Sequence, residues 1–366
     1  MVFYITTLNS RSHIGIGISG KVTAQVEAMK AELGAIYYTV LTYPKAYLMD
    51  GKKIVEERVA VSRNDYVKVL IEWMKKYHVT ATYIRYVRST KSFLDFLKYQ
   101  KENGIKTVLE IPSYPYDQET PDGIMKKTDQ CYRKELYKYV SRLSTYSSDE
   151  QIWGISCIKL KNGINIQQVP IHGKKKEKEK IVLISISTLR TWHGYERILE
   201  GMYQYYKADG VYDFRLKIIG SGPEEVYYRE LVDRYGLYDH VEFLGLIKTD
   251  EKERLNKEFD ASDIALGSLG MYKAGYEEGS PIKCAEYCAR GIPFIYGYYD
   301  LRFPQDWDFM LRVSNDSKPI DMNQVIDFYE NVTSKKNYKK IIRKYAEDYL
   351  TWDNIMQPVV EYLQAD

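Results

Sequence analysis

Residues 277–293 hold charged side chains at a spacing that suits anion binding. Ser280 has the side chain of a helix N-cap residue, Pro281 has the fixed φ of a first helical residue, and Gly291 suits the position after the last turn. We therefore predict a helix over residues 281–290. Its N-terminus would present unpaired N–H groups and the positive end of the helix dipole, which together favour a bound phosphate.

Lys283 falls in the first turn of this helix. The helix dipole disfavours a cation there by about 0.3–1 kcal/mol, so a lysine makes sense if a phosphate lies between it and the N–H groups. The alternative is an exposed lysine that pairs with Glu286, three residues later. We favour the phosphate contact.

Two carboxylates flank the same helix. Glu278 precedes it and Glu286 lies in its second turn. Because a helix rises about 1.5 Å per residue, the two side chains would be separated by about the length of a sugar nucleotide along one edge of the sheet.

Each half of the chain begins like a nucleotide-binding unit, with a strand, a glycine-bearing turn and a helix. In the first half these are residues 2–7, 13–20 and 21–33, and in the second half residues 181–185, 186–194 and 195–206. Further expected strands cover residues 37–43, 82–86, 106–111, 215–219, 241–244, 264–266 and 293–295, and further helices cover residues 65–77, 92–102 and 224–235. This alternation predicts an α/β protein with two doubly wound, Rossmann-like domains that face each other across a cleft.

The Lys-rich tract 174–180 is the most polar stretch near the middle of the chain. We expect an N-terminal, acceptor-side domain over residues 1–170, a linker over 171–180 and a C-terminal, nucleotide-binding domain over 181–345. The last residues, 346–366, are expected to form a helix that packs back on the N-terminal domain.

Composition restricts the protein class. The 366 residues suffice for two domains, no apolar run approaches the ~18 residues of a membrane span, and four dispersed cysteines indicate thiols in a reducing cytoplasm. The net charge is +3, yet residues 1–170 carry 25 basic and 17 acidic side chains, and residues 181–366 carry 23 and 31. The basic half could meet phosphates or an anionic membrane surface, or its charge could simply keep the protein soluble.

An ordered set of motifs resembles the GT-B glycosyltransferases, in particular the retaining family 4 enzymes of bacterial surface-polysaccharide synthesis. The set comprises the glycine turn 15–20, the turn 162–164, the glycine turn 220–222, the strand end 241–245 and the pair Glu278…Glu286 followed by Gly291-Ile292-Pro293. The resemblance covers nearly the whole chain. It implies that Glu286 binds the ribose and that Glu278 contacts the transferred sugar as a catalytic residue. It also implies that Gly279, Ser280 and Lys283 hold the diphosphate, and that Gly17 and Gly222 belong to the donor-binding glycine turns.

Two positions depart from the family pattern. The Arg and Lys that the family has after the first strand of the second domain are here Thr188 and His193. We expect Arg190 to bind the diphosphate in their place, with His193 or Arg197 also within reach. A sugar-facing His is absent from residues 109–119, where Tyr114, Tyr116 and Asp117 are candidates for the acceptor site. His13, beside the first glycine turn, is a candidate catalytic residue that approaches the donor, or a structural histidine.

We expect no metal and no cofactor, with the nucleotide sugar as substrate. Asp306-Trp307-Asp308 resembles a metal-binding Asp-x-Asp motif but lies well past the helix, and we interpret it as a loop. Cys284 and Cys288 have no partner pair nearby in the sequence, so buried thiols are favoured over a zinc site.

These features predict a cytoplasmic, metal-independent glycosyltransferase that moves a sugar, with retention, from a nucleotide diphosphate donor to a saccharide acceptor. UDP is the preferred nucleotide. The acceptor could be lipid-linked, with the enzyme peripheral at the inner membrane face, and no nucleic-acid partner is expected. The alternatives are a nucleotide-sugar epimerase of the same fold and a noncatalytic binding subunit that resembles a glycosyltransferase.

Overall fold

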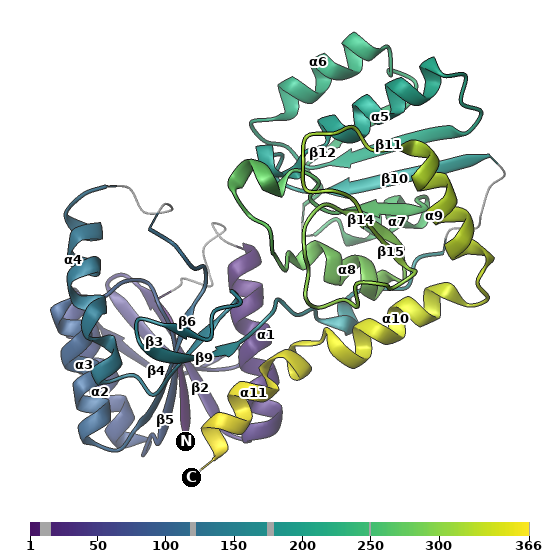
Figure 1. The fold of residues 1–366 in the computed structure, drawn as a ribbon. Helices are drawn as coiled ribbons and strands as arrows, with labels where there is room; N and C mark the ends of the chain where they lie inside the picture. Colours follow the sequence, from purple (N-terminus) through teal and green to yellow (C-terminus); the bar gives the residue numbers. More distant parts are fainter. Residues whose placement is uncertain (8–15, 118–121, 174–178, 249, 366) are drawn as a thin grey trace. The chain divides into compact units, whose positions relative to one another are not determined.

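The chain divides into two compact units. The computed structural model describes residues 1–365 except 8–15, 118–121, 174–178 and 249, and Figure 1 shows its elements. Unit 1 comprises Met1–Lys161 with Trp352–Asp366, and unit 2 comprises Asn162–Thr351. Residues 162–173 therefore belong to the second unit, whereas we expected the first domain to extend to residue 170. The helix that returns to unit 1 begins at Trp352 rather than at residue 346.

Unit 1 contains a nine-stranded sheet in the order β4-β3-β2-β1-β5-β6-β7-β9-β8. The strands are β1 (Val2–Ile5), β2 (Ile36–Thr42), β3 (Lys45–Asp50), β4 (Lys53–Val59), β5 (Ala81–Arg85), β6 (Lys106–Ile111), β7 (Arg142–Thr145), β8 (Gln151–Ile152) and β9 (Ile155–Lys159). The six central strands, β2-β1-β5-β6-β7-β9, pair parallel. At one edge of the sheet β3 and β4 pair antiparallel, and at the other edge β8 pairs antiparallel with β9. Sequence order reverses between β1 and β5, which makes their carboxyl ends the switch point of the sheet.

Helices cover both faces of this sheet. They are α1 (Ile16–Leu33), α2 (Arg63–Lys76), α3 (Lys91–Glu102), α4 (Ile124–Tyr132) and α11 (Trp352–Gln364), with a 3₁₀ helix at Arg133–Lys138. Alternate residues of β1 explain the two faces: Val2 and Tyr4 pack with α1 and α11, whereas Phe3 and Ile5 pack with α2 and α3. Both helix layers are thus built on the same short apolar strand.

Two local features of unit 1 differ from expectation. The hairpin β3–β4 was not predicted, because β4 is an edge strand whose charged residues Glu56, Glu57 and Arg58 hide the apolar alternation. Helix α1 begins at Ile16, so Gly17 and Gly20 lie within the helix rather than in a glycine turn before it.

Unit 2 contains a six-stranded parallel sheet in the order β12-β11-β10-β13-β14-β15. The strands are β10 (Lys180–Ile186), β11 (Asp213–Ile219), β12 (Val241–Gly245), β13 (Ile264–Leu266), β14 (Phe294–Tyr296) and β15 (Met310–Arg312). The chain first proceeds from β10 to β12 and then continues on the other side of β10 with β13. The switch point therefore lies between the carboxyl ends of β10 and β13, where open α/β sheets bind ligands.

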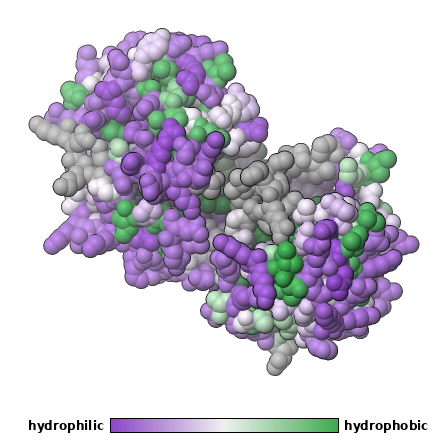
Figure 2. Space-filling view, turned by 180° about the vertical axis from the view of Figure 1, so that it is seen from behind, coloured by the Kyte–Doolittle hydropathy of each residue, from purple (hydrophilic) through white to green (hydrophobic). Residues whose placement is uncertain are grey.

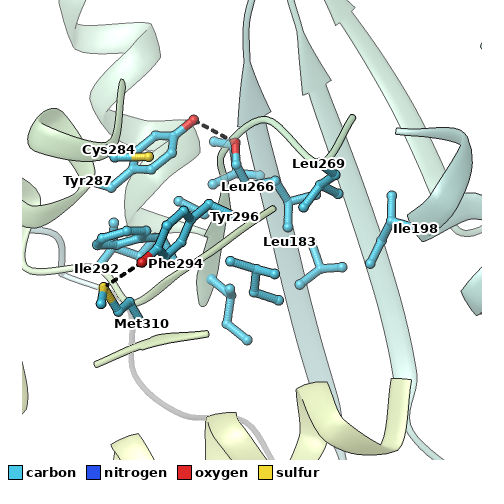
Figure 3. Packing of buried hydrophobic residues seen from close by; sticks show 14 of the residues in the cluster. Leu183, Ile198, Leu266, Leu269, Cys284, Tyr287, Ile292, Phe294, Tyr296 and Met310 are labelled. Atoms are coloured by element: carbon cyan, nitrogen blue, oxygen red, sulfur yellow. Dashed lines mark hydrogen bonds between the residues drawn. The ribbon is translucent and has the colours of Figure 1, made fainter. Parts of the chain in front are cut away.

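The helices of unit 2 are α5 (Glu196–Lys207), α6 (Glu225–Tyr235), α7 (Lys252–Asp260), α8 (Ile282–Arg290), α9 (Met322–Ser334) and α10 (Tyr338–Tyr349). Short 3₁₀ helices cover Ile166–Gln168, Thr191–His193 and Met271–Ala274. One continuous hydrophobic core joins these helices to the sheet. Within it, the hydroxyl of Tyr287 on α8 donates to the carbonyl of Leu266 at the end of β13, at 3.0 Å (Figure 3). This bond fixes α8 against the edge of the sheet where the switch point lies.

The surface is mostly polar. Figure 2 shows one face, on which hydrophilic side chains predominate and hydrophobic ones gather in small separate patches. Among the helices in the described ranges, none has the length and apolar character that crossing a membrane requires.

Candidate functional site

The switch point of unit 2 brings together three polar side chains from separate segments. His193 follows β10, Ser268 follows β13, and Lys283 lies in the first turn of α8. The Nδ1 atom of His193 lies 3.1 Å from Oγ of Ser268 and 3.2 Å from Nζ of Lys283. Lys283 thus lies at the N-terminus of α8 and at the switch point of the sheet, both of which favour anions.

The protonation state of His193 follows from these contacts. An ammonium group can only donate, so Nδ1 of His193 is the acceptor and the imidazole is neutral. Burial, and secondly the charge of Lys283, lower the pKa of His193 to about 2. The ring of Tyr195 stacks on His193 with 5.7 Å between centroids, and its hydroxyl lies 3.5 Å from Nζ of Lys283. A neutral, tightly packed histidine therefore orients the lysine without competing with it for an anion.

This pKa gives a pH-dependent stability. A histidine in the unfolded chain takes up a proton near pH 6.5, whereas His193 in the folded protein stays neutral, so falling pH favours unfolding. Between pH 7.5 and 5.5 this linkage amounts to about 1.4 kcal/mol. We expect His193→Asn to remove about this much of the decline in unfolding free energy, measured by urea titration at both pH values. An unchanged decline in the variant would contradict the neutral state of His193.

The start of α8 differs in detail from the prediction. The helix begins at Ile282, and Pro281 occupies the N-cap position without a side-chain cap, so Ser280 is not the N-cap residue. Instead the carbonyl of buried Ser280 accepts a 2.9 Å bond from the Asn162 amide. Arg302, which pairs with Asp300 inside the unit, donates to the carbonyl of Pro281 at 2.8 Å. Tertiary contacts therefore hold this backbone in place of a side-chain cap.

The two carboxylates flanking α8 have different surroundings. Oε1 of Glu286 accepts from Nε and Nη2 of Arg290 at 3.0 and 2.7 Å, and Arg290 is in turn held by Asn256 and by the ring of Phe259. Lys283 pairs with His193 rather than with Glu286, so the alternative ion pair is not formed. Glu278 is exposed, in a bridge to Tyr299 just before the helix. Arg290 thus holds the Glu286 carboxylate in place, whereas the exposed Glu278 side chain forms no ion pair with any residue that the structure describes.

Two glycines allow the loops after β10 and β11 to approach closely. A Cβ at Gly220 would lie 1.8 Å from the carbonyl oxygen of Ser187, and one at Gly222 would lie 2.4 Å from that of Leu189. The backbone bond from Leu189 to Ser221, at 2.9 Å, requires this approach. Arg190 follows in the same loop, where it is exposed and forms no ion pair with any residue the structure describes. At Gly279, beside the start of α8, an added Cβ would lie 3.1 Å from the Cε atom of Met271.

The predicted acceptor residues form a cluster in unit 1. Asp117 pairs with Arg133 through two bonds of 2.9 and 2.8 Å, which lower the pKa of the carboxyl, and the Tyr116 hydroxyl donates to Asp129 at 2.6 Å. Tyr114 meets the ring of Trp153 edge-on at 6.1 Å. The three predicted acceptor side chains are therefore held by contacts within unit 1, with Arg133, Asp129 and Trp153. His13 lies outside the described residues.

Several site residues were not identified from the sequence. Ser268 and Tyr195 are buried neighbours of His193, and Arg290 positions Glu286. Ser268 lies two residues after an expected strand, and applying the switch-point rule to that strand would have found it. In the described ranges no group of three or more His, Cys, Asp or Glu side chains is arranged as a metal site, and Asp308 pairs with Lys335 at 2.9 Å.

The segment that contains these site residues is similar to a known protein family. Residues 169–299 match the family described as group 1 glycosyl transferases. This segment contains His193, Ser268, Lys283 and Glu286. The matched segment also contains β10 and β13, whose carboxyl ends form the switch point of unit 2.

The similar curated proteins are named as colanic acid biosynthesis glycosyltransferases, WcaL of Salmonella typhimurium and of Escherichia coli. Each is 29% identical to this chain over 133 residues, which are 36% of this chain and 32% of the relative. The chain thus spans about a third of the length of the curated relatives that it matches.

Solved structures match nearly the whole chain. A Rickettsia africae glycosyltransferase has a TM-score of 0.62 at 13% identity, covering 99% of this chain and 97% of its own. Anabaena HepE in complex with UDP gives 0.62 at 13%, and the lipopolysaccharide outer core galactosyltransferase WaaB gives 0.60 at 14%, each covering 99% of both chains. This likeness confirms the predicted GT-B fold with its two Rossmann-like sheets.

Proposed function

We propose that the protein transfers a sugar from a nucleotide diphosphate sugar to a saccharide acceptor in polysaccharide synthesis. The observation that carries the proposal is the Lys283 ammonium, bound to neutral His193 at the switch point of a sheet inside the group 1 glycosyltransferase segment. The whole chain shares its fold with HepE, whose structure contains UDP, which makes UDP the first nucleotide to test.

The chemistry explains why a cation belongs there. In the transfer, the bond between the anomeric carbon and the diphosphate oxygen breaks, and a bond from the anomeric carbon to an acceptor hydroxyl oxygen forms. The proton of that hydroxyl passes to the departing diphosphate. Negative charge grows on the diphosphate as the first bond breaks. Lys283, the N–H groups at the start of α8, and the backbone of Gly279 and Ser280 would stabilise that charge because they are oriented before the reaction.

The two glutamates would bind the rest of the donor. Glu286, which Arg290 holds through Oε1, would accept hydrogen bonds from the ribose hydroxyls through its other oxygen. Exposed Glu278 would contact the transferred sugar. Arg190 and the glycine loop at Gly222 would add contacts to the diphosphate, and retention at the anomeric carbon is part of the proposal.

Titration of the full chain with UDP, GDP, ADP and TDP, and with their sugar conjugates, tests the donor half of the proposal. We expect one nucleoside diphosphate to bind, and its sugar conjugate to be consumed in EDTA as well as in buffer, since Lys283 and the helix N-terminus would serve in place of a metal. Failure of all four nucleotides to bind would overturn the proposed function. Activity lost in EDTA and restored by manganese would overturn its metal-free part.

Glu286 offers a residue-level test of nucleotide binding. We expect Glu286→Ala to weaken binding of the nucleoside diphosphate by about 1–3 kcal/mol, because hydrogen bonds to a charged carboxylate are lost. Isothermal calorimetry measures this change directly. Glu230→Ala, which removes an exposed carboxylate from α6, is the matched control. Equal affinities for the wild type and Glu286→Ala would show that Glu286 does not bind the ribose.

The acceptor is proposed to be lipid-linked, and the protein to act at the cytoplasmic face of a membrane. The basic side chains of unit 1 give this idea mixed support. Lys76 pairs with Glu56, and Lys98 pairs with Glu102, whereas Lys68 and Lys91 are exposed cations on α2 and α3.

A further inference from the structure

Unit 1 contains a cavity of about 300 Å³ at the carboxyl ends of β1, β2 and β5. It therefore lies at the switch point of the N-terminal sheet, the position at which such sheets bind ligands. Helices α2 and α3 form its other wall. Nothing in the proposed donor chemistry uses this cavity.

The inner walls are apolar. They include side chains from three strands and both helices: Ile5, Leu41, Tyr66, Leu70, Ile84 and Phe96. Tyr66 is polar only at its hydroxyl, which is already satisfied by Thr39 at 2.7 Å. The interior therefore suits an aliphatic group and offers little to a sugar ring, whose hydroxyls need hydrogen-bond partners.

Two of the arginines that line the cavity, Arg63 and Arg88, are not paired with a carboxylate of any described residue. Arg63 begins α2 and Arg88 follows β5. Burial, and secondly the charge of Arg88, lower the pKa of Arg63, so the two guanidinium groups lie close enough to repel each other. Arg85 also lines the cavity but is paired with Glu110.

The helix termini add to this positive potential. Helices α2 and α3 both begin at the cavity, after the N-cap residues Ser62 and Thr90. A cation in a first helical turn is unfavourable unless an anion balances it. Asp65 lies in the first turn of α2 but bonds Ser62 and forms no ion pair with Arg63. The hydroxyls of Thr90 and Ser92 also line the cavity and can donate to an anion.

We propose that this cavity binds the phosphate ester of an aliphatic alcohol, with the phosphate at Arg63 and Arg88 and the aliphatic chain between α2, α3 and the sheet. On the proposed function, this ligand is the lipid-phosphate end of the saccharide acceptor. Three apolar side chains near Arg63 and Arg88 are unusually exposed, Tyr43, Val61 and Val87 at 55%, 66% and 58%. They would let the chain enter without crossing a polar surface.

Alkyl phosphates of increasing chain length test the chemistry directly. Each methylene that enters the cavity should tighten binding about fourfold, so decyl, octyl and hexyl phosphate should bind in that order. Inorganic phosphate and octanol each lack half of the ligand, and both should bind far more weakly than octyl phosphate. Octanol binding as tightly as octyl phosphate would overturn the proposal, as would an affinity independent of chain length.

Two variants separate the charged and apolar parts of the site. Arg63→Gln and Arg88→Gln should each weaken octyl phosphate about tenfold or more and leave octanol unchanged. Val67→Phe, on the half-buried wall of α2, should weaken every alkyl ligand by filling the cavity. Lys68→Gln, which removes the adjacent exposed cation of α2 outside the cavity, is the matched control and should bind octyl phosphate like the wild type. Equal losses in Lys68→Gln and Arg63→Gln would overturn the assignment.

Nucleotide binding by the same variants separates this proposal from the previous one. Arg63→Gln and Arg88→Gln should bind the nucleoside diphosphate like the wild type, since the donor residues belong to unit 2. If the wild type binds octyl phosphate but no nucleoside diphosphate, the proposed function is refuted and the cavity assignment stands. If the wild type binds a nucleoside diphosphate but not octyl phosphate, the cavity assignment is refuted and the proposed function stands.

Discussion

Lys283→Met should reduce kcat/KM for sugar transfer by about 10²–10³-fold. Removal of one preorganised donor to a developing negative charge has an effect of this size, because the interaction strengthens as the diphosphate departs. The Kd of the nucleoside diphosphate should rise about tenfold, since a charge-assisted hydrogen bond is lost already in the ground state. Initial rates and calorimetry on the full chain measure the two quantities.

The fold should survive this substitution. Nδ1 of His193 still bonds Ser268 at 3.1 Å, and the methionine side chain can pack against the Tyr195 ring. Lys336→Met removes an exposed lysine of the same unit and should leave both rate and affinity unchanged. A kcat/KM within threefold of wild type in Lys283→Met would exclude Lys283 from the reaction.

Gly220→Ala should lower the free energy of unfolding by roughly 2–5 kcal/mol, because it combines backbone strain with a clash. Gly220 has φ of 121°, and an added Cβ would lie 1.8 Å from the carbonyl oxygen of Ser187. The oxygen belongs to the backbone, so relief requires the loop after β10 to move. That loop also holds Arg190 and His193, and nucleotide affinity should therefore fall in parallel.

Gly236→Ala provides the matched control. Gly236 has φ of 65°, but an added Cβ there meets no atom within 4 Å. Its cost should be limited to the left-handed backbone, about 1–2 kcal/mol, with no change in nucleotide binding. The urea midpoints of the two variants measure the difference. Equal midpoints would mean that the close approach of the two loops contributes nothing.

Local sequence signals determined most of the elements of unit 2. The strand at residues 264–266 is bounded as predicted, because a short apolar run between helices has few other solutions. The end of α8 at Gly291 was likewise readable, since glycine readily adopts the φ of 69° found there. The predicted GT-B fold rested on a resemblance, that of the pair Glu278…Glu286 and the glycine turns to the motifs of GT-B glycosyltransferases, and the solved structures confirm it.

Other features depend on contacts between distant residues. Ser280 has the side chain of an N-cap residue, but bonds from Asn162 and Arg302 to the backbone of residues 280 and 281 move the helix start to Ile282. Edge strand β4 escaped detection because half-exposed pairing leaves little apolar pattern. The first domain ends before residue 170 because Ile166 and Val169 are buried in the hydrophobic core of unit 2.

The sequence by itself determined which residue types meet at the switch point of unit 2, because parallel strands deliver their following loops to one edge of the sheet. Only the tertiary structure decided how those residues act on one another. His193 became a neutral acceptor through burial and the nearby Lys283, and Glu286 took Arg290 rather than Lys283 as its partner. Hydrogen bonding and desolvation depend on distances of a few ångströms between segments far apart in the chain, which residue type and spacing do not specify.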